Sequence, residues 1–417
     1  MKTYIFFFIA CISIGDLQAQ VTLQSCQERA KANYPMIKQY DLISKSAEYN
    51  ISNANKAYLP QVSVTGIGAY IFKGLPSISP PGVTPKEDNK AQFIGIGQIN
   101  QTLWDGGATR TQKEIIKAGA EVEKSSVDVA FFNIRERVNQ LYFGILVIDA
   151  QLNQLNVFRA NIDRNLKAVS LSKNNGLAYQ TDIDELKAEW MNLDQRTIEF
   201  TYTRKGYVEM LAFLIGQPLP DTIHVNKPIV LGSIAQSAIN RPELILYANQ
   251  RKLVTAQASL QRVYNMPKVG LLGAGVVIEP GLGFGSSTLS SLAIGGLSLS
   301  WNTASLYKTT NNKQLDKINL DKIANQEETF LFNTTLQLKQ VSTDIEKQRT
   351  ILAKDQEIAQ LKLKITKGYQ LKYENGVCSM NELIQAMNKE TEARSQEALH
   401  QVQLLMNLYN YQTLSGN

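Results

Sequence analysis

The stretch QINQTLWDGGATR, residues 98–110, joins two different sequence patterns. Polar and apolar residues alternate up to Trp104, which is typical of a strand with one apolar face. Asp105, Gly106 and Gly107 follow, and then no proline occurs between residues 108 and 172, which predicts a long helix. A glycine pair before a helix indicates either a phosphate-binding loop or a sharp corner between two elements.

The same series of patterns occurs twice along the chain. With an offset of 207, Pro35 and Pro60 match Pro242 and Pro267. With an offset of 200, the Asn-Gly pair at 175–176 matches the pair at 375–376. Matches that keep register over such distances predict an internal duplication.

The duplication favours the corner interpretation. The positions that match residues 104–107 hold Ala304, Ser305, Leu306 and Tyr307, without glycine. We therefore expect the bend to tolerate other residues, with Gly106 and Gly107 only easing it. Asp105 is expected to cap the helix that follows, and Ser305 to do the same in the second half.

The repeat divides the chain into four segments. Residues 1–19 hold a lysine and an apolar run at 4–14, which predicts a cleaved signal peptide. Residues 20–218 and 234–417 are the expected repeats, joined by a linker at 219–233. Each repeat is expected to contain a helix of about 35 residues, two strands and a long helical hairpin. The expected strands are 61–72, 92–103, 268–278 and 289–301, and the hairpin tips are expected near 174–182 and 373–382.

The strand lengths fit those of tilted membrane strands, which span a bilayer in about 9–11 residues. In the segment 92–103, Ile99 and Leu103 oppose Gln98, Asn100 and Thr102. The segment 268–278 has no polar face, so alternation of polar and apolar residues does not support its prediction as a strand. An ordinary soluble sheet covered by helices is the alternative interpretation.

The long helices carry a coiled-coil pattern. In the first, apolar residues recur at steps of three and four, with Arg159 at one position of the series. The second, expected at about 307–371, has a weaker series that Gln348 and Asp355 interrupt. Shorter antiparallel partners are expected at 182–215 and 381–414. The apolar series are Leu141, Ile145, Ile148, Leu152, Leu155, Ile162, Leu166 and Val169, and then Leu331, Leu338, Val341, Ile345 and Leu352.

Composition excludes several classes of protein. The formal charge of +6 comes from 43 basic and 37 acidic residues spread along the chain, without the clustered basic face that nucleic acid requires. The chain has two histidines and three cysteines, in none of the usual metal-binding or catalytic spacings. We therefore expect no enzyme, no metal and no cofactor, and we expect both histidines to be surface or cap residues.

The order of these elements resembles the TolC family of outer-membrane efflux channels. The resemblance rests on NKAYLPQVSVTGIGAY, QTLWDGG, GLSLSW and LAFLIGQPLP, and on their spacing over the whole mature chain. It implies a mainly α-helical protein with a transmembrane β portion, in which three protomers of four strands each close a 12-stranded outer-membrane β-barrel. A long coiled-coil α-helical barrel would continue from it into the periplasm.

The same resemblance implies the location, the function and the partners. The homotrimer would lie in outer-membrane lipid of a Gram-negative bacterium. It would be the exit duct of a tripartite efflux or type I secretion system. A periplasmic adaptor and an inner-membrane pump or ABC transporter would deliver the substrate. Trp104 would lie at the edge of the lipid, at a junction with the tube formed by Trp104, Asp105, Gly106 and Gly107.

The resemblance also assigns the two hairpin tips. Asn175, Gly176, Asn375 and Gly376 match the turns that contact the adaptor, although an Asn-Gly pair is also an ordinary helix stop. Thr181, Asp182 and Tyr373 match groups that hold the entrance closed. The family has an arginine where this chain has Cys378, so a link from Asp182 to that arginine cannot form and closure must differ or be weaker.

A ring of acidic residues narrows the pore in the family. Glu382 matches the first acidic position of that ring, and Gln385 replaces the second. Three copies of Glu382 would attract cations. The alternative is a solvated residue favoured by the helix dipole.

One other class of protein fits the long helices. A periplasmic coiled-coil adaptor or scaffold would also contain helical hairpins, but usually one hairpin flanked by compact β domains. Two hairpins with paired strand segments at matching positions disfavour that alternative.

Overall fold

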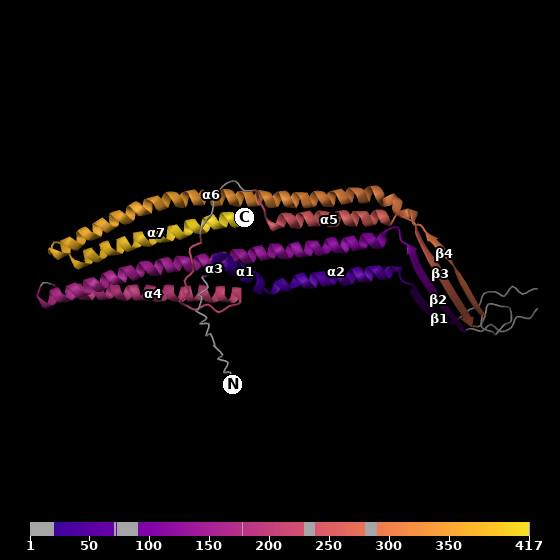
Figure 1. The fold of residues 1–417 in the computed structure, drawn as a ribbon, viewed down its shortest axis with the longest axis horizontal. Coiled ribbons are helices and arrows are strands. Elements are labelled where there is room, and N and C mark those ends of the chain that lie inside the picture. The colour runs from indigo at the N-terminus through magenta and orange to yellow at the C-terminus, as the bar shows by residue number, and fades with distance from the viewer. Residues whose placement is uncertain are drawn as a thin grey trace, which may run out of the picture. The chain divides into compact units, whose positions relative to one another are not determined.

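A computed structural model describes residues 21–70, 72, 91–176, 178–228, 238–279 and 290–416 (Figure 1). The expected signal peptide, both expected strand–strand loops and part of the expected linker lie outside these ranges. The chain divides into two compact units. Within the described residues, unit 1 holds the segments up to Ile37, Ala130–Arg241 and Leu331–Asn417, and unit 2 holds Lys38–Val129 and Pro242–Phe330.

From α2 onward, the α-helices and strands follow the same order in the two halves of the chain. In the first half, α2 (Gln39–Asn55) leads through η2 (Lys56–Tyr58) to the strands β1 (Gln61–Tyr70) and β2 (Ala91–Trp104). The helices α3 (Ala108–Asn174) and α4 (Gln180–Ile215) follow. The second half has α5 (Pro242–Val263), β3 (Lys268–Glu279), β4 (Ser290–Ser300), η3 (Thr303–Lys308), α6 (Thr309–Glu374) and α7 (Met380–Ser415).

The expected helix of about 35 residues is wrong in both halves, because α5 has only 22 residues and the helix of the first half is interrupted. It consists of α1 (Leu23–Asn33), η1 (Pro35–Lys38) and α2. Tyr34 has an extended backbone, with φ −66° and ψ 128°. A residue before proline disfavours the helical conformation, so Pro35 explains the break.

The four strands form one sheet in the order β1-β2-β3-β4, with every pair antiparallel (Figure 1). The β2–β3 pairing joins the two expected hairpins, with Gly97 opposite Gly275. Among the described residues, the sheet therefore has two open edges, β1 and β4.

A β-bulge interrupts the β2–β3 register next to the corner. Thr102 pairs with Gly270, but Val269 pairs with Trp104 rather than with Leu103. A bulge inserts one residue and re-aims the side chains after it. Strict alternation would put Trp104 beside Asn100 and Thr102, whereas the bulge turns it to the face that Val269 shares.

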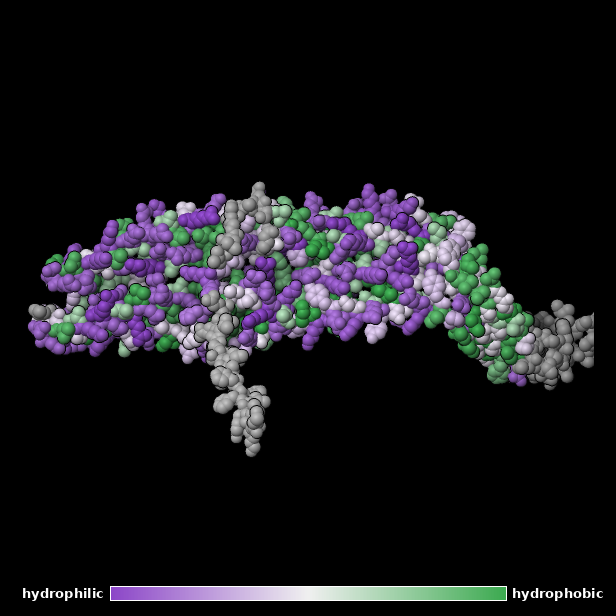
Figure 2. Space-filling model, viewed as in Figure 1, coloured by the Kyte–Doolittle hydropathy of each residue, from purple (hydrophilic) through white to green (hydrophobic). Residues whose placement is uncertain are grey.

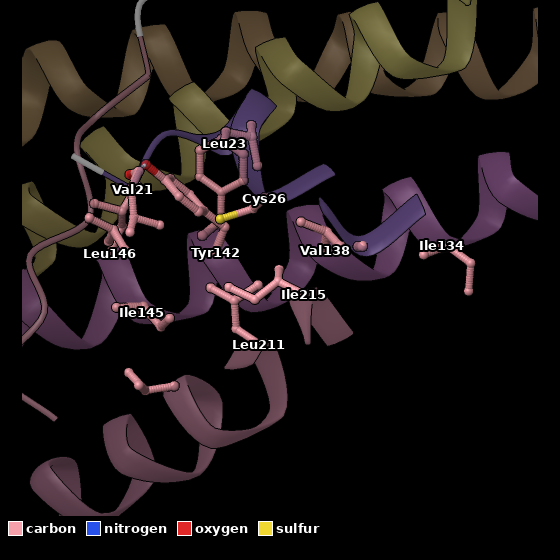
Figure 3. Close-up of a cluster of buried hydrophobic side chains, with 14 of the residues drawn as sticks. Val21, Leu23, Cys26, Ile134, Val138, Tyr142, Ile145, Leu146, Leu211 and Ile215 are labelled. Atoms are coloured by element: carbon pink, nitrogen blue, oxygen red, sulfur yellow. Dashed lines mark hydrogen bonds between the residues drawn. The ribbon is translucent and has the colours of Figure 1, made fainter. Parts of the chain in front are cut away.

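Unit 1 contains two apolar cores. In the first, drawn in Figure 3, the N-terminal Val21, Leu23 and Cys26 pack against α3 and α4. The Tyr142 hydroxyl lies 2.9 Å from the Val21 carbonyl and 2.7 Å from that of Asn226. Burial raises the pKa of the Cys26 thiol to about 11, which makes it unreactive.

The second core lies near the hairpin tips and joins α3, α4 and α7. Ile183 and Leu186 of α4 and Leu383 and Ile384 of α7 belong to it, so the two tips are level with each other. Its buried members are Leu155, Phe158, Ile162, Val169, Ile183, Leu186, Leu193, Met380, Leu383, Ile384 and Met387.

The predicted apolar series of both long helices are buried or half-buried, which confirms them. The two polar interruptions in α6 pair with side chains of α7. Gln348 donates to the Gln403 side chain at 3.2 Å, and His400 Nδ1 lies 2.5 Å from Asp355 Oδ2. The expectation that His400 is a surface or cap residue is therefore wrong, because its side chain is only 20% exposed. No described helix is apolar over a length that would cross a membrane.

Candidate functional site

The sheet has one face that is almost entirely apolar. Side chains alternate along each strand and paired residues share a face. Val62 of β1 therefore lies on the same side as Ile99 of β2, and Leu271 of β3 on the same side as Leu297 of β4. These side chains are exposed, from Leu271 at 42% to Leu297 at 78%. The large exposed members of this face are Val62, Val64, Tyr70, Phe93, Ile99, Trp104, Leu271, Val277, Leu297 and Leu299.

The opposite face is polar at the end where the strands join the helices. Gln61 lies opposite Asn100, Ser63 opposite Gln98, and Lys268 opposite Ser300. Figure 2 shows the contrast with the helices, since hydrophobic residues gather over the strands and hydrophilic residues cover much of the visible helical surface. An apolar face of this size marks a surface that meets lipid or another apolar partner.

Asp105 is the centre of the first corner, where β2 passes into α3. It is 6% exposed. Its Oδ1 accepts from the Gly107 N–H at 2.9 Å and from the Tyr58 hydroxyl at 3.0 Å, and its Oδ2 accepts from the Thr109 N–H at 2.7 Å. Asp105 therefore caps α3, in line with the sequence expectation.

These hydrogen bonds also favour the ionised form of the Asp105 carboxyl. Burial alone would raise the pKa of its carboxyl. Hydrogen bonds from Thr109, Tyr58 and Gly107 outweigh burial and hold the pKa below its usual range. The buried corner thus contains a stable carboxylate.

The glycine pair does more than ease the bend, so that expectation is wrong. Gly106 and Gly107 have φ of +71° and +94°, a region that residues with side chains rarely adopt. A Cβ on Gly106 would lie 2.7 Å from Met266 Cβ, whereas a Cβ on Gly107 would have open space. Gly106 is therefore required for the close approach of the two chain segments.

The second corner is built differently. Asn302, and not Ser305, caps it, because the Asn302 side chain accepts from the Ala304 N–H at 3.1 Å. The Ser305 hydroxyl instead donates to the Asn302 carbonyl at 2.8 Å. The short η3 then makes the turn without a positive φ, which is why this corner needs no glycine.

Both hairpin tips have a glycine with positive φ at the end of the long helix. Gly176 and Gly376 both have positive φ, at +74° and +71°, and end their helices. At the second tip the Val377 N–H donates to the Lys372 carbonyl at 2.8 Å, and Asn375 Nδ2 donates to the Leu371 carbonyl at 2.7 Å. The Asn-Gly pairs thus act as helix stops.

Asp182 and Glu382 occupy the same place in the first turns of α4 and α7. The Asp182 carboxylate accepts from the Tyr179 N–H at 3.0 Å. The Glu382 carboxylate accepts from the Ser379 N–H at 2.8 Å and from its hydroxyl at 3.1 Å. The bonds from Ser379 lower the pKa of Glu382, so this exposed side chain is charged at neutral pH.

Tyr373 lies where the two hairpins meet. Its ring packs against the core near the tips. Burial, and then the nearby charges of Asp182, Cys378 and Glu185, raise the pKa of its hydroxyl. The structure thus brings Asp182, Tyr373, Cys378 and Glu382 to one end of unit 1.

Thr181 is exposed at that same end, and Cys378 is half-buried. The Cys378 thiol donates to the Tyr369 carbonyl at 3.5 Å. Burial, and then the charge of Glu382, raise the pKa of this thiol. Among the residues that the structure describes, no group of three acidic, histidine or cysteine side chains could hold a metal ion.

Two parts of these sites could not be predicted from the sequence. Tyr58 and Thr109 complete the Asp105 network, and no local signal marks Tyr58 as a partner of a residue 47 positions away. The bulge at Leu103 was also missed, because only the partner strand defines it.

The fold matches solved outer-membrane channels over nearly the whole chain. An outer-membrane protein of Vibrio cholerae, VceC, has a TM-score of 0.65 at 13% identity, with 94% of this chain and 96% of that chain covered. The outer-membrane channel OprN has a TM-score of 0.64 at 15% identity, with 95% and 90% covered. The open state of the Neisseria gonorrhoeae channel MtrE also has a TM-score of 0.64 at 15% identity, with 94% and 88% covered.

No protein-family model matches the sequence, and no curated protein matches it. At identities this low the similarity establishes the fold alone. The chain has the TolC-like fold that the resemblance implied, mainly helical with a small sheet.

Proposed function

We propose that this chain is the subunit of an outer-membrane channel, the exit duct of an efflux or secretion system. One observation carries the proposal: a four-stranded antiparallel sheet with an exposed apolar face and two open edges continues through built corners into long helices. Lipid does not tolerate open sheet edges, so a sheet of this kind must close with other copies. Three copies would give 12 strands, an even number typical of outer-membrane barrels.

At the end where the strands join the helices, the sheet also has the polarity that such a barrel requires. Its apolar face would meet outer-membrane lipid, with Trp104 near the polar boundary. Its opposite face would line a lumen: it is polar at the helix end, with Gln98 and Asn100, and carries exposed Ile67, Leu292 and Ile294 farther along the strands. This division supports a channel over a periplasmic adaptor, for which an exposed apolar sheet has no use.

The helical tips fit the periplasmic end of the duct. Asn175, Gly176, Asn375 and Gly376 would contact a periplasmic adaptor that joins an inner-membrane pump or ABC transporter. Thr181, Asp182, Tyr373 and Cys378 would form the closable entrance. Their gathering at one end of unit 1 supports this assignment.

The proposed domain division follows the duplication. Residues 20–218 and 234–417 would be repeats joined by a linker at 219–233, after a signal peptide at 1–19. The matching order of elements in the two halves supports it.

The mass of the detergent-extracted particle tests the channel proposal. We expect a homotrimer with bound detergent in the outer-membrane fraction of a Gram-negative host. A monomer that needs no detergent to stay in solution would overturn the proposal.

Conductance in planar bilayers tests the entrance. Three Glu382 carboxylates around one axis would attract cations. Replacing Glu382 by alanine is expected to lower cation selectivity and weaken block by divalent cations, while Glu374→Ala serves as a control. Unchanged selectivity would show that Glu382 acts only as a capping residue.

A further inference from the structure

Basic side chains gather where the helices of unit 2 meet the sheet (Figure 1). The four helix ends and their connections to the strands lie at residues 46–60, 105–117, 254–267 and 301–318, and hold eight basic and four acidic side chains. The hairpin tips, at residues 165–189 and 365–389, hold six of each. The excess of positive charge is therefore concentrated next to the sheet rather than spread evenly along the chain.

Part of this charge is already paired within the chain. Arg110 Nε lies 3.4 Å from the Glu114 carboxylate, and Lys113 Nζ donates to the Asn55 side chain at 2.9 Å. Four other lysines next to the sheet have exposed side chains, which an outside partner can reach. These corner lysines are Lys56, Lys308, Lys313 and Lys317.

Exposed aromatic side chains accompany the corner lysines. Tyr307, directly before Lys308, is 88% exposed. Trp301 is 58% exposed, and its indole N–H donates to the Asn265 carbonyl at 3.0 Å, which holds the ring at the end of the sheet. Tyrosine and tryptophan favour the headgroup level of a membrane, and lysine places its ammonium there while its stem follows apolar surface. The two residue types together are typical of a membrane interface.

We propose that the corner lysines bind the anionic headgroups of phospholipids in the periplasmic leaflet of the outer membrane. This inference rests on the proposed channel, because it requires the sheet to lie in that membrane. Negatively charged lipids attract basic residues that lie directly beside a membrane-spanning segment. The corners are where the chain would leave the bilayer, so their lysines have the position as well as the charge for this partner.

Distances along α6 limit which lysines take part. An α-helix rises about 1.5 Å per residue, so Lys313 and Lys317 lie about 6 and 12 Å beyond the start of α6 at Thr309. The headgroup layer is about 5–7 Å thick, and charges act over about 8 Å at physiological ionic strength. Lys317 is therefore near the limit of this reach. Lys322, about 20 Å along the same helix, lies outside it.

Quenching of tryptophan fluorescence by brominated lipids tests the proposal. Of the three tryptophans, Trp104 and Trp301 lie at the corners, whereas Trp190 packs against the core near the tips. The purified protein would be reconstituted in vesicles of phosphatidylcholine that contain either brominated phosphatidylglycerol or brominated phosphatidylcholine. We expect phosphatidylglycerol to bind about fivefold more tightly for each corner lysine that it contacts. The preference should decline in about 1 M salt, because salt screens the attraction.

Matched variants locate the preference on α6. The change Lys308→Gln/Lys313→Gln should remove most of it, and Lys308→Arg/Lys313→Arg should keep it because the charge remains. The control Lys322→Gln/Lys339→Gln removes two exposed charges from the same helix beyond the reach of the headgroups and should leave the preference unchanged.

Three results would overturn the proposal. The first is equal quenching by the two lipids in the unchanged chain, and the second is an equal loss of preference in the control variant. The third is unchanged quenching in Lys308→Gln/Lys313→Gln together with a shift of permeability from anions towards cations in planar bilayers, which would show that the lysines face the lumen. A protein that stays a monomer in solution and does not enter vesicles would instead overturn the proposed channel.

Discussion

Replacing Gly106 by alanine tests the corner at which the chain leaves the sheet. The φ of +71° costs an L-residue about 1–2 kcal/mol. The new Cβ would lie 2.7 Å from Met266 Cβ, and relieving such overpacking costs about 1–3 kcal/mol more. We therefore expect the variant to destabilise the corner by about 2–5 kcal/mol in total.

Gly107→Ala is the matched control. It has a positive φ of +94° but open space around its Cβ, so only the backbone cost of about 1–2 kcal/mol applies. Hydrogen exchange by mass spectrometry measures the opening of the first turn of α3. At 1.4 kcal/mol per tenfold, exchange should rise about 30-fold or more for Gly106→Ala and about 5- to 30-fold for Gly107→Ala.

A second substitution separates the clash from the backbone cost. The contacting atom is the Met266 Cβ, so Met266→Gly should partly rescue Gly106→Ala, whereas Met266→Ala should not. Equal effects of Gly106→Ala and Gly107→Ala would refute the close approach. Rescue by Met266→Ala would refute the assignment of the clash to Cβ.

Three further changes test the charged and packed groups by thermal melting in detergent. The folded pKa of Asp105 is lowered, so its contribution to stability is complete above the unfolded pKa of about 3.9 and is lost as pH falls through the folded value. Asp105→Asn should remove this pH dependence. An unchanged dependence of the melting temperature on pH would show that Asp105 is not its source. Asp355→Leu alone should cost about 1–3 kcal/mol by leaving His400 unpaired. Adding His400→Phe should restore most of the lost stability, because Leu155 and Phe200 occupy the equivalent positions of the first repeat, at the offset of 200. A double variant no more stable than Asp355→Leu would contradict this expectation. Gly270→Ala puts a Cβ 2.7 Å from the Gln101 carbonyl oxygen and should lower the melting temperature, whereas Gly296→Ala, with open space, should not. Equal melting of the two glycine variants would exclude crowding at the bulge.

The elements themselves could be predicted from sequence because their signals are local. The expected helix from residue 108 to about 172 is observed as α3, Ala108–Asn174. The expected strand at 92–103 is observed as β2, Ala91–Trp104. Periodicity of two or of 3.6 is a property of neighbouring residues, so it survives without knowledge of the partners.

The assignments at the tips remain predictions for a different reason. The structure gives Asp182 and Glu382 capping roles inside one chain. Whether Thr181, Tyr373 and Cys378 close an entrance depends on neighbouring copies, because three chains must meet there.

In the stretch 98–110, some features follow from the sequence and others only from the tertiary structure. The sequence by itself determined that a strand ends at Trp104 and a long helix begins at residue 108, because alternation and helical periodicity change there. Only the tertiary structure decided that Leu103 is a bulge, that Trp104 turns to the apolar face, and that Gly106 admits Met266. Those features depend on β3 and on the end of α5, which lie more than 150 residues farther along the chain. Close packing between such distant segments leaves no trace in the local pattern of either one.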